Sequence, residues 1–250
     1  MHSNPVQSPQ PPQQTSFSEG LPSIGPWDGL HPNKLPISSM HVDRELPEVA
    51  RTWGRIVDTT KLLPGDLILT RDTKPDDISE AISAAQEKGG FPKRHAQWTH
   101  AAIYLGDGEH ICEANFKVPN IPWGVRMRSI YNYCDGNTAL RARRPKVHDD
   151  QQRIRIAIGA MTSLGKGYSF SQIYSFAKAA YSGRGFWQNG ETRQRISRKP
   201  LVCSTLYQDA YNFSYQGVTV RMGTMCTPAH LSASPDFETD DPEIGWLEIV

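Results

Sequence analysis

Cys203 is the residue of this 250-residue chain whose position best fits a nucleophile. It lies in the stretch LVCSTLYQDAY (residues 201–211), which follows Pro200 and carries apolar residues at helical spacing. A cysteine in the first turn of a helix lies at the positive end of the helix dipole, beside free backbone N–H groups, and both favour the thiolate. The same N–H groups can hold the oxyanion of an acyl-transfer reaction. The alternative is a small buried cysteine that performs no chemistry.

A thiol nucleophile needs a base, normally a histidine, and an acceptor that orients the base. Residues 99–115 predict a β-hairpin that begins near His100 and turns at GDG (residues 106–108). If the turn has an even number of residues, Ala102 faces Glu113, and Glu113 then shares a face with His100, one diagonal step away. An odd number would send Glu113 to the opposite face. The alternative for His100 is a hydrogen-bonded histidine at a strand edge.

Other chemical motifs are absent or incomplete in the sequence. Residues 159–167 (GAMTSLGKG) miss the P-loop, because the spacing is one residue too long and Gly167 replaces Ser or Thr. The chain contains no GxSxG, no HExxH and no cysteine pair at zinc spacing, so the sequence predicts no cofactor and no metal. Cys112, Cys134 and Cys226 are expected to be reduced thiols, with Cys112 on the face opposite Glu113. Trp98 and Trp123 are interpreted as packing residues.

Periodicity and capping signals predict the elements that must position these residues. Strands are expected over residues 67–70 and 140–144, and helices over 76–88, 151–164, 169–181 and 201–211. The first helix has Ile78, Ile82 and Ala85 on one face. Helical spacing in the second comes from Ile154, Ile158 and Met161. The acidic segment 236–248 is expected to be a solvated surface segment.

Composition limits the class of protein. Hydrophobic residues make up 38% of the chain, which suffices for a core, and the net charge of +1 gives no global basic field for nucleic acid. No apolar run approaches the ~18 residues of a membrane span. Residues 1–45, rich in Pro, Gln and Ser, predict a disordered tail before a domain at 46–250. The N-terminus has neither the basic nor the apolar region of a standard secretory signal peptide.

Three segments, taken in this order, resemble the permuted NlpC/P60 group of papain-like cysteine hydrolases. They are LPGDLIL (63–69), WTHAAIYLGDG continuing into ICEA (98–114), and VCSTL (202–206) followed by Tyr211. A looser match is TPAHL (227–231). The resemblance implies an α+β fold with a small antiparallel sheet that carries the histidine and its acidic partner, and with the cysteine helix packed against that sheet. It also implies acyl transfer through a thioester, with Cys203 as nucleophile, His100 as base and Glu113 as orienter.

The resemblance leaves the substrate open. One expectation is an amidase or endopeptidase acting on peptidoglycan stem peptides. Such an enzyme is expected to be made in a bacterial cytoplasm, exported as an effector toxin by a specialised secretion apparatus and paired with an immunity protein. The alternative is an acyl hydrolase or acyltransferase acting on lipids or acylated proteins, in which the basic insert at 183–199 would grip an anionic head group. A third possibility is a non-catalytic binding module of the same fold.

Overall fold

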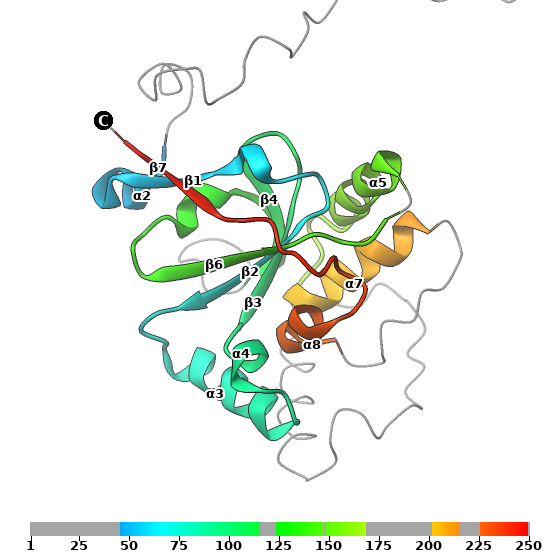
Figure 1. Cartoon of the computed structure of the whole chain (residues 1–250), viewed down its shortest axis with the longest axis horizontal. Helices are drawn as coiled ribbons and strands as arrows, with labels where there is room; N and C mark the ends of the chain where they lie inside the picture. The colour runs from blue at the N-terminus through cyan, green and yellow to red at the C-terminus, as the bar shows by residue number, and fades with distance from the viewer. Residues whose placement is uncertain (1–45, 116–123, 148, 169–201, 216–225, 250) are drawn as a thin grey trace, which may run out of the picture.

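The computed structural model describes residues 46–115, 124–147, 149–168, 202–215 and 226–249. The expected tail (1–45), the helix expected over 169–181, the basic insert 183–199 and Trp123 lie outside the described residues. Within the described parts the architecture is α+β, with antiparallel sheets and several helices (Figure 1). None of the helices described there is long and apolar enough to cross a membrane.

The main sheet has five strands, all antiparallel to their neighbours, in the order β5-β4-β3-β2-β6. In that order the strands are Gly124–Ser129, His110–Asn115, His100–Tyr104, Leu67–Asp72 and Thr138–Arg143. The register of the β3-β4 hairpin pairs Ala102 with Glu113, so the even-turn alternative is correct and Glu113 lies on the His100 face. The sequence analysis did not predict β5.

Each face of this sheet contacts a different hydrophobic cluster. Leu69, Ala101 and Ile103 belong to a cluster with residues of α5 (Asp150–Met161) and α7 (Cys203–Ser214). The alternating residues, such as Ile68 and Ala102, pack with α2 (Glu48–Trp53), β1 (Arg55–Asp58) and the 3-10 turn η4 (Ile130–Tyr133). Figure 1 shows α5 and α7 together on one side of the sheet and α2 with β1 on the other. The α7 helix therefore covers the face opposite to the one that His100 shares with Ala102.

The buried face of α5 is not the one that carries the apolar residues at helical spacing. Ile154, Ile158 and Met161 are 49%, 41% and 38% exposed, whereas Ile156 and its small neighbours are buried. An added Cβ at Gly159 would lie 3.0–3.1 Å from atoms of Phe213 and Ala210 on α7, so small residues set this close helix contact. The helix also ends at Met161, three residues earlier than expected. Two faces of α5 have helical spacing, and packing against α7 selected the one with smaller side chains.

The acidic segment 236–248 lies at the surface, as predicted, apart from the buried Phe237, and it is also attached to the body of the protein. Its strand β7 (Gly245–Glu248) pairs with β1, and Asp241 accepts hydrogen bonds from Arg141 at 2.6 Å and Arg143 at 3.1 Å. These bases lie about a hundred residues earlier in the chain, so local charge balance could not reveal them.

Three short helices border the end of the sheet where β3 begins: α3 (Asp77–Lys88), α4 (Lys93–Ala96) and α8 (Pro228–Ala233). Gln86 on α3 joins them. Its amide nitrogen donates to the carbonyl oxygens of Ala96 at 2.8 Å and Trp98 at 2.9 Å, and its amide oxygen accepts from the Ala229 N–H at 2.8 Å. Because Gln86 is buried, these bonds fix α3 beside the start of α8.

The turn before β2 positions α7. Gly65 has a φ of +81°, a left-handed conformation that favours glycine, and its carbonyl accepts from the Tyr207 hydroxyl of α7 at 3.0 Å. Asp66 is fully buried and accepts from the Leu63 N–H at 2.8 Å and from Arg144 at 2.9 Å. The PGD segment thus connects the sheet to the helix that begins at Cys203.

Candidate active site

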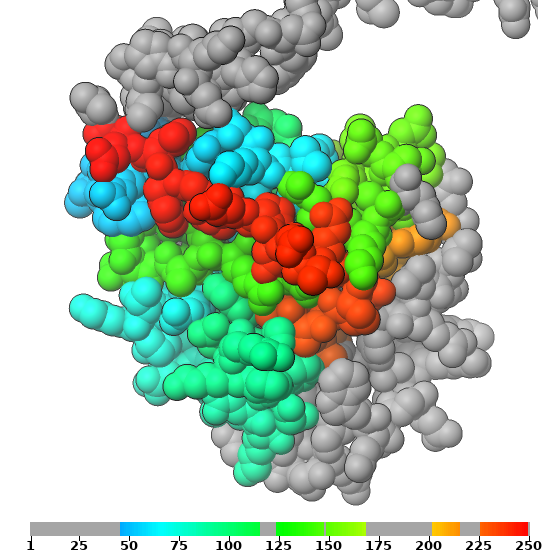
Figure 2. Space-filling view, viewed as in Figure 1, coloured from blue at the N-terminus to red at the C-terminus, as the bar shows by residue number. Residues whose placement is uncertain are grey.

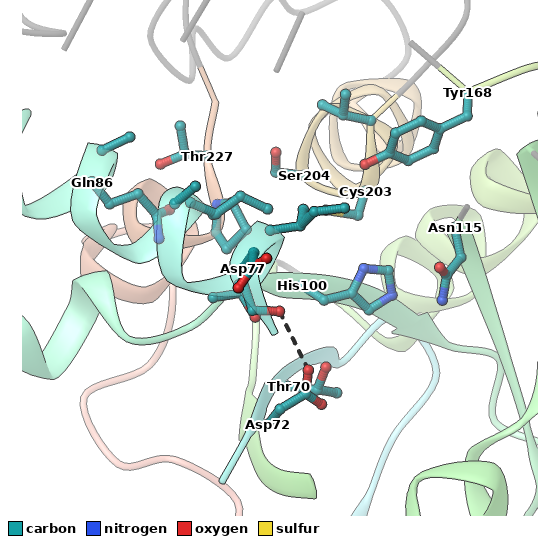
Figure 3. Close-up of a pocket in the computed structure, with 18 of the residues that line it drawn as sticks. Thr70, Asp72, Asp77, Gln86, His100, Asn115, Tyr168, Cys203, Ser204 and Thr227 are labelled. Atoms are coloured by element: carbon teal, nitrogen blue, oxygen red, sulfur yellow. Dashed lines mark hydrogen bonds between the residues drawn. The ribbon is translucent and has the colours of Figure 1, made fainter. Parts of the chain in front are cut away.

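A cavity of about 300 Å³ brings together residues from the sheet, α3, α7 and α8 (Figure 3). Cys203 and His100 both line it, although 103 positions separate them in the chain. Asn115 and Tyr168 lie on one side of this pair in Figure 3, and Gln86 and Thr227 lie on the other. A cavity of this size is at the lower end of the range typical of small-molecule sites.

Cys203 is the first residue of α7, as the sequence predicted, and its exposed fraction is 6%. The helix has 12 residues, so its dipole and its free N–H groups favour negative charge at this end. The neighbouring Ser204 donates from its hydroxyl to the Cys226 carbonyl oxygen at 2.8 Å, and the Val202 N–H donates to the Thr205 hydroxyl at 3.1 Å. These bonds fix the start of the helix, and with it the thiol.

His100 connects the thiol to the carboxylate. Its Nε2 lies 2.9 Å from Glu113 Oε2, which leaves Nδ1 for Cys203. Burial alone would lower the pKa of His100, but the hydrogen bond and charge of Cys203, and then those of Glu113, outweigh burial and raise the pKa to about 10. The arrangement therefore favours a charged imidazolium at neutral pH, which would stabilise negative charge beside it.

Glu113 is fully buried and receives donors on both oxygens. The Tyr133 hydroxyl donates to Oε2, while Oε1 lies 3.3 Å from both Asn115 Nδ2 and Arg126 Nη2, and 3.8 Å from Arg128 Nη1. Burial raises the pKa of this carboxyl, but His100, Tyr133 and Arg128 together lower it to about 2. Glu113 is thus ionised and held in one orientation, as a group that must fix an imidazole tautomer should be.

The residues that surround Glu113 were not predicted from the sequence. Arg126 pairs directly across from Glu113 in the β4-β5 register, and Arg128 follows on the same face of β5. Arg128 also stacks over the Tyr133 ring, with its guanidinium carbon 5.5 Å from the ring centroid. The alternation GVRMRS was the available signal, since it places two arginines on one side of a strand. It could not reveal which strand those arginines would face.

Tyr168 is a second group that the sequence analysis did not single out. It lines the cavity, and in Figure 3 its hydroxyl points toward the start of α7, where Cys203 lies. Burial, followed by the negative charge of Cys203, raises the pKa of Tyr168 well above its ordinary value. Its hydroxyl therefore keeps its proton and can donate to negative charge that develops near the thiol.

The remaining cysteines lie in different surroundings. Cys112, Cys134 and Cys226 are free and buried, and none of them lines the cavity. Burial raises the pKa of Cys112 to about 12 and that of Cys134 to about 11, and it raises the pKa of Cys226 further still. All three are expected to be neutral thiols at neutral pH. Trp98 is buried in the same cluster as α7, in agreement with its interpretation as a packing residue.

No group of His, Cys, Asp and Glu side chains within the described ranges could hold a metal ion. The comparison with models of known protein families found no match, and the comparison with curated proteins found no significant relative. Any assignment of function therefore rests on the residues and their geometry.

The donors around Glu113 predict how stability depends on pH. Because folding lowers the pKa of this carboxyl from 4.5 to about 2, its charge contributes roughly 3 kcal/mol to the free energy of unfolding. That contribution is complete above pH 4.5 and is lost as the pH falls through about 2. We expect Glu113→Gln to lower the free energy of unfolding by about that amount at pH 7. The difference in this free energy between wild type and variant should become smaller by pH 3. Urea unfolding at both pH values measures it.

The matched control is Glu87→Gln on α3, because Glu87 is exposed and its charge should contribute little at either pH. If the free energies of unfolding of wild type and Glu113→Gln differed by the same amount at pH 7 and at pH 3, the carboxylate would not be held ionised by its neighbours.

Proposed function

We propose that this protein is a cysteine hydrolase in which Cys203 is the nucleophile, His100 the base and Glu113 the residue that orients the base. The observations that support this best are the His100–Glu113 hydrogen bond, the place of Cys203 and His100 on one cavity, and an imidazole with a raised pKa beside a carboxylate with a lowered one. Activated thiol nucleophiles in acyl-transfer enzymes have this arrangement.

In the first step, the Cys203 thiolate attacks the carbonyl carbon of the substrate and forms a tetrahedral oxyanion. Backbone N–H groups at the start of α7 and the Tyr168 hydroxyl are the donors available to it. The bond to the leaving group then breaks, and that group takes the proton of the His100 imidazolium. The products of this step are a free alcohol, thiol or amine and a thioester on Cys203.

In the second step, neutral His100 takes a proton from water while the water oxygen attacks the thioester. The carbon–sulfur bond breaks, a carboxylic acid leaves, and the thiolate and imidazolium are restored. Glu113 remains ionised in both steps and stabilises the charged imidazole. An acceptor alcohol or amine in place of water would turn the same sequence into acyl transfer.

We propose further that the fold is that of the permuted NlpC/P60 enzymes. Two features support this: the histidine and its acidic partner come from adjacent strands of one antiparallel sheet, and both precede the cysteine helix in the chain. The PGD turn, whose Gly65 carbonyl binds the Tyr207 hydroxyl of the cysteine helix, is a third.

Two substrate classes fit this chemistry. Cleavage of amide bonds in peptidoglycan stem peptides, by an exported effector with an immunity partner, follows from the sequence resemblance alone. Hydrolysis or transfer of lipid or protein acyl groups is the second candidate. The lining of the cavity favours the second, because most of the α3 residues that line it are apolar.

The test is to trap the acyl-enzyme. After brief incubation with p-nitrophenyl acetate, the mass spectrum of the intact protein should show one added acetyl group, and peptide mapping should place it on Cys203. Hydroxylamine should remove this acetyl group. The Cys203→Ser variant should form no thioester, whereas the Cys112→Ser variant should be labelled like the wild type. Labelling elsewhere, or none, would contradict a hydrolase that uses this thiol. Peptidoglycan fragments and phospholipid vesicles, offered separately, then distinguish the two substrate classes by their products.

A further inference from the structure

The α3 helix has an apolar stripe that does not contribute to either hydrophobic cluster of the described residues. Ile78, Ala81, Ile82 and Ala85 follow one another at the spacing of a single helix face. Such a stripe normally packs against a core. Here none of the four belongs to either cluster, and Ile78 is 44% exposed.

All four residues of this stripe, which we call the α3 wall, line the cavity that contains Cys203 and His100. Val202 and Pro228 add to the apolar lining of the same cavity. The position of the wall is fixed, because the buried Gln86 bonds α3 to the carbonyl of Ala96 and to the N–H of Ala229 on α8. The apolar lining is therefore a fixed part of the same cavity that contains the nucleophile.

The charged groups of the cavity exclude one kind of occupant. Asp72 and Asp77 are the carboxylates that line it, and Figure 3 places both near His100. Asp72 accepts a hydrogen bond from the Ser79 hydroxyl at 3.3 Å, and Asp77 is exposed at the start of α3. An acyl group that carries its own carboxylate would be repelled there, whereas a neutral hydrocarbon group would not.

We propose that the α3 wall is the subsite for the acyl group that Cys203 receives, and that this group is an uncharged hydrocarbon chain. The inference rests on the proposed hydrolase function and names its substrate class. The cavity has about twice the volume of an apolar cavity that accepts a benzene ring, so at about 300 Å³ it takes a chain on the order of ten carbons. The chain can come from a lipid ester or from an acylated protein, since both present the same hydrocarbon to the wall.

The experiment measures kcat/KM for p-nitrophenyl esters from acetate to dodecanoate, each kept below its solubility limit. Each methylene that enters the cavity should raise kcat/KM up to about fourfold, and the gain should stop near ten carbons. Ala81→Phe places a ring on the wall and should reduce the decanoate-to-acetate ratio of kcat/KM by tenfold or more. Ala84→Phe adds the same ring to the same helix outside the cavity and should leave the ratio unchanged.

A second readout needs no turnover. The rate at which N-alkyl iodoacetamides modify Cys203 should rise with alkyl length in the wild type and in Ala84→Phe, but not in Ala81→Phe. If the protein hydrolyses the acetate ester but neither assay depends on chain length, the acyl subsite is overturned and the hydrolase function remains. The α3 wall would then be covered by something other than the acyl group. Chain-dependent alkylation without ester hydrolysis would overturn the hydrolase and leave the subsite.

Two further substrates distinguish the sources of the chain. Vesicles of phosphatidylcholine with decanoyl chains present it as a lipid ester, and a peptide with an N-decanoyl lysine presents it as an acylated protein. Release of decanoic acid from either one supports the subsite and identifies the source. Release from neither, with p-nitrophenyl decanoate also no better than acetate, would overturn it.

Discussion

At pH 6, iodoacetamide should alkylate Cys203 on the order of a hundredfold or more faster than each of the other three cysteines. The thiolate is the reacting species, and burial keeps Cys112 and Cys134 protonated, with pKa values of about 12 and 11. A thiol of higher pKa forms a more nucleophilic thiolate, but this offsets only about half of the decrease in rate that its smaller thiolate fraction causes. Cys203, in contrast, lies beside a charged His100 and lines a cavity.

Peptide mapping by mass spectrometry gives the four rates separately. Labelling in 8 M urea (about the usual denaturing concentration) is the control, because all four thiols should then react at similar rates. If Cys203 reacted no faster than Cys134 in the folded protein, the thiolate–imidazolium pair would not exist.

Replacing His100 by alanine should lower kcat/KM for p-nitrophenyl acetate by about 10³ or more, because the base and the charged partner of the thiol are lost together. Alkylation of Cys203 at pH 6 should slow in the same variant, while the other cysteines keep their rates. In the wild type, turnover of an amide substrate should also fall as the pH rises through about 10, where the imidazolium that protonates the amine leaving group is lost.

His110→Ala is the matched control, since His110 lies on the same hairpin but bonds to Asp107 in the turn, away from the cavity. Circular dichroism and thermal unfolding confirm that each variant is folded. Equal losses in His100→Ala and His110→Ala would mean that the effect is on the hairpin and not on the thiol.

The sequence alone was sufficient for the local features that position the candidate site. Acidic capping and the double glycine predicted the α3 helix within one residue, and the glycine-rich turn predicted the hairpin but left open whether Glu113 or its neighbour shares the face of His100. The position of Cys203 at the start of a helix also followed from local spacing. These features depend on residues close in the chain, where periodicity, capping and turn chemistry act directly.

Only the tertiary structure decided which distant groups meet. Arg126 and Tyr133 surround Glu113, and Asp241 binds Arg141 and Arg143, through contacts between separate elements that leave no local pattern. For the same reason the apolar spacing of α5 did not reveal which of its faces is buried. The sequence also did not predict what the apolar stripe of α3 contacts, although that stripe lines the cavity that contains Cys203. Helical spacing fixes which side chains share a face, but the shape and charge of the neighbouring elements decide what that face contacts.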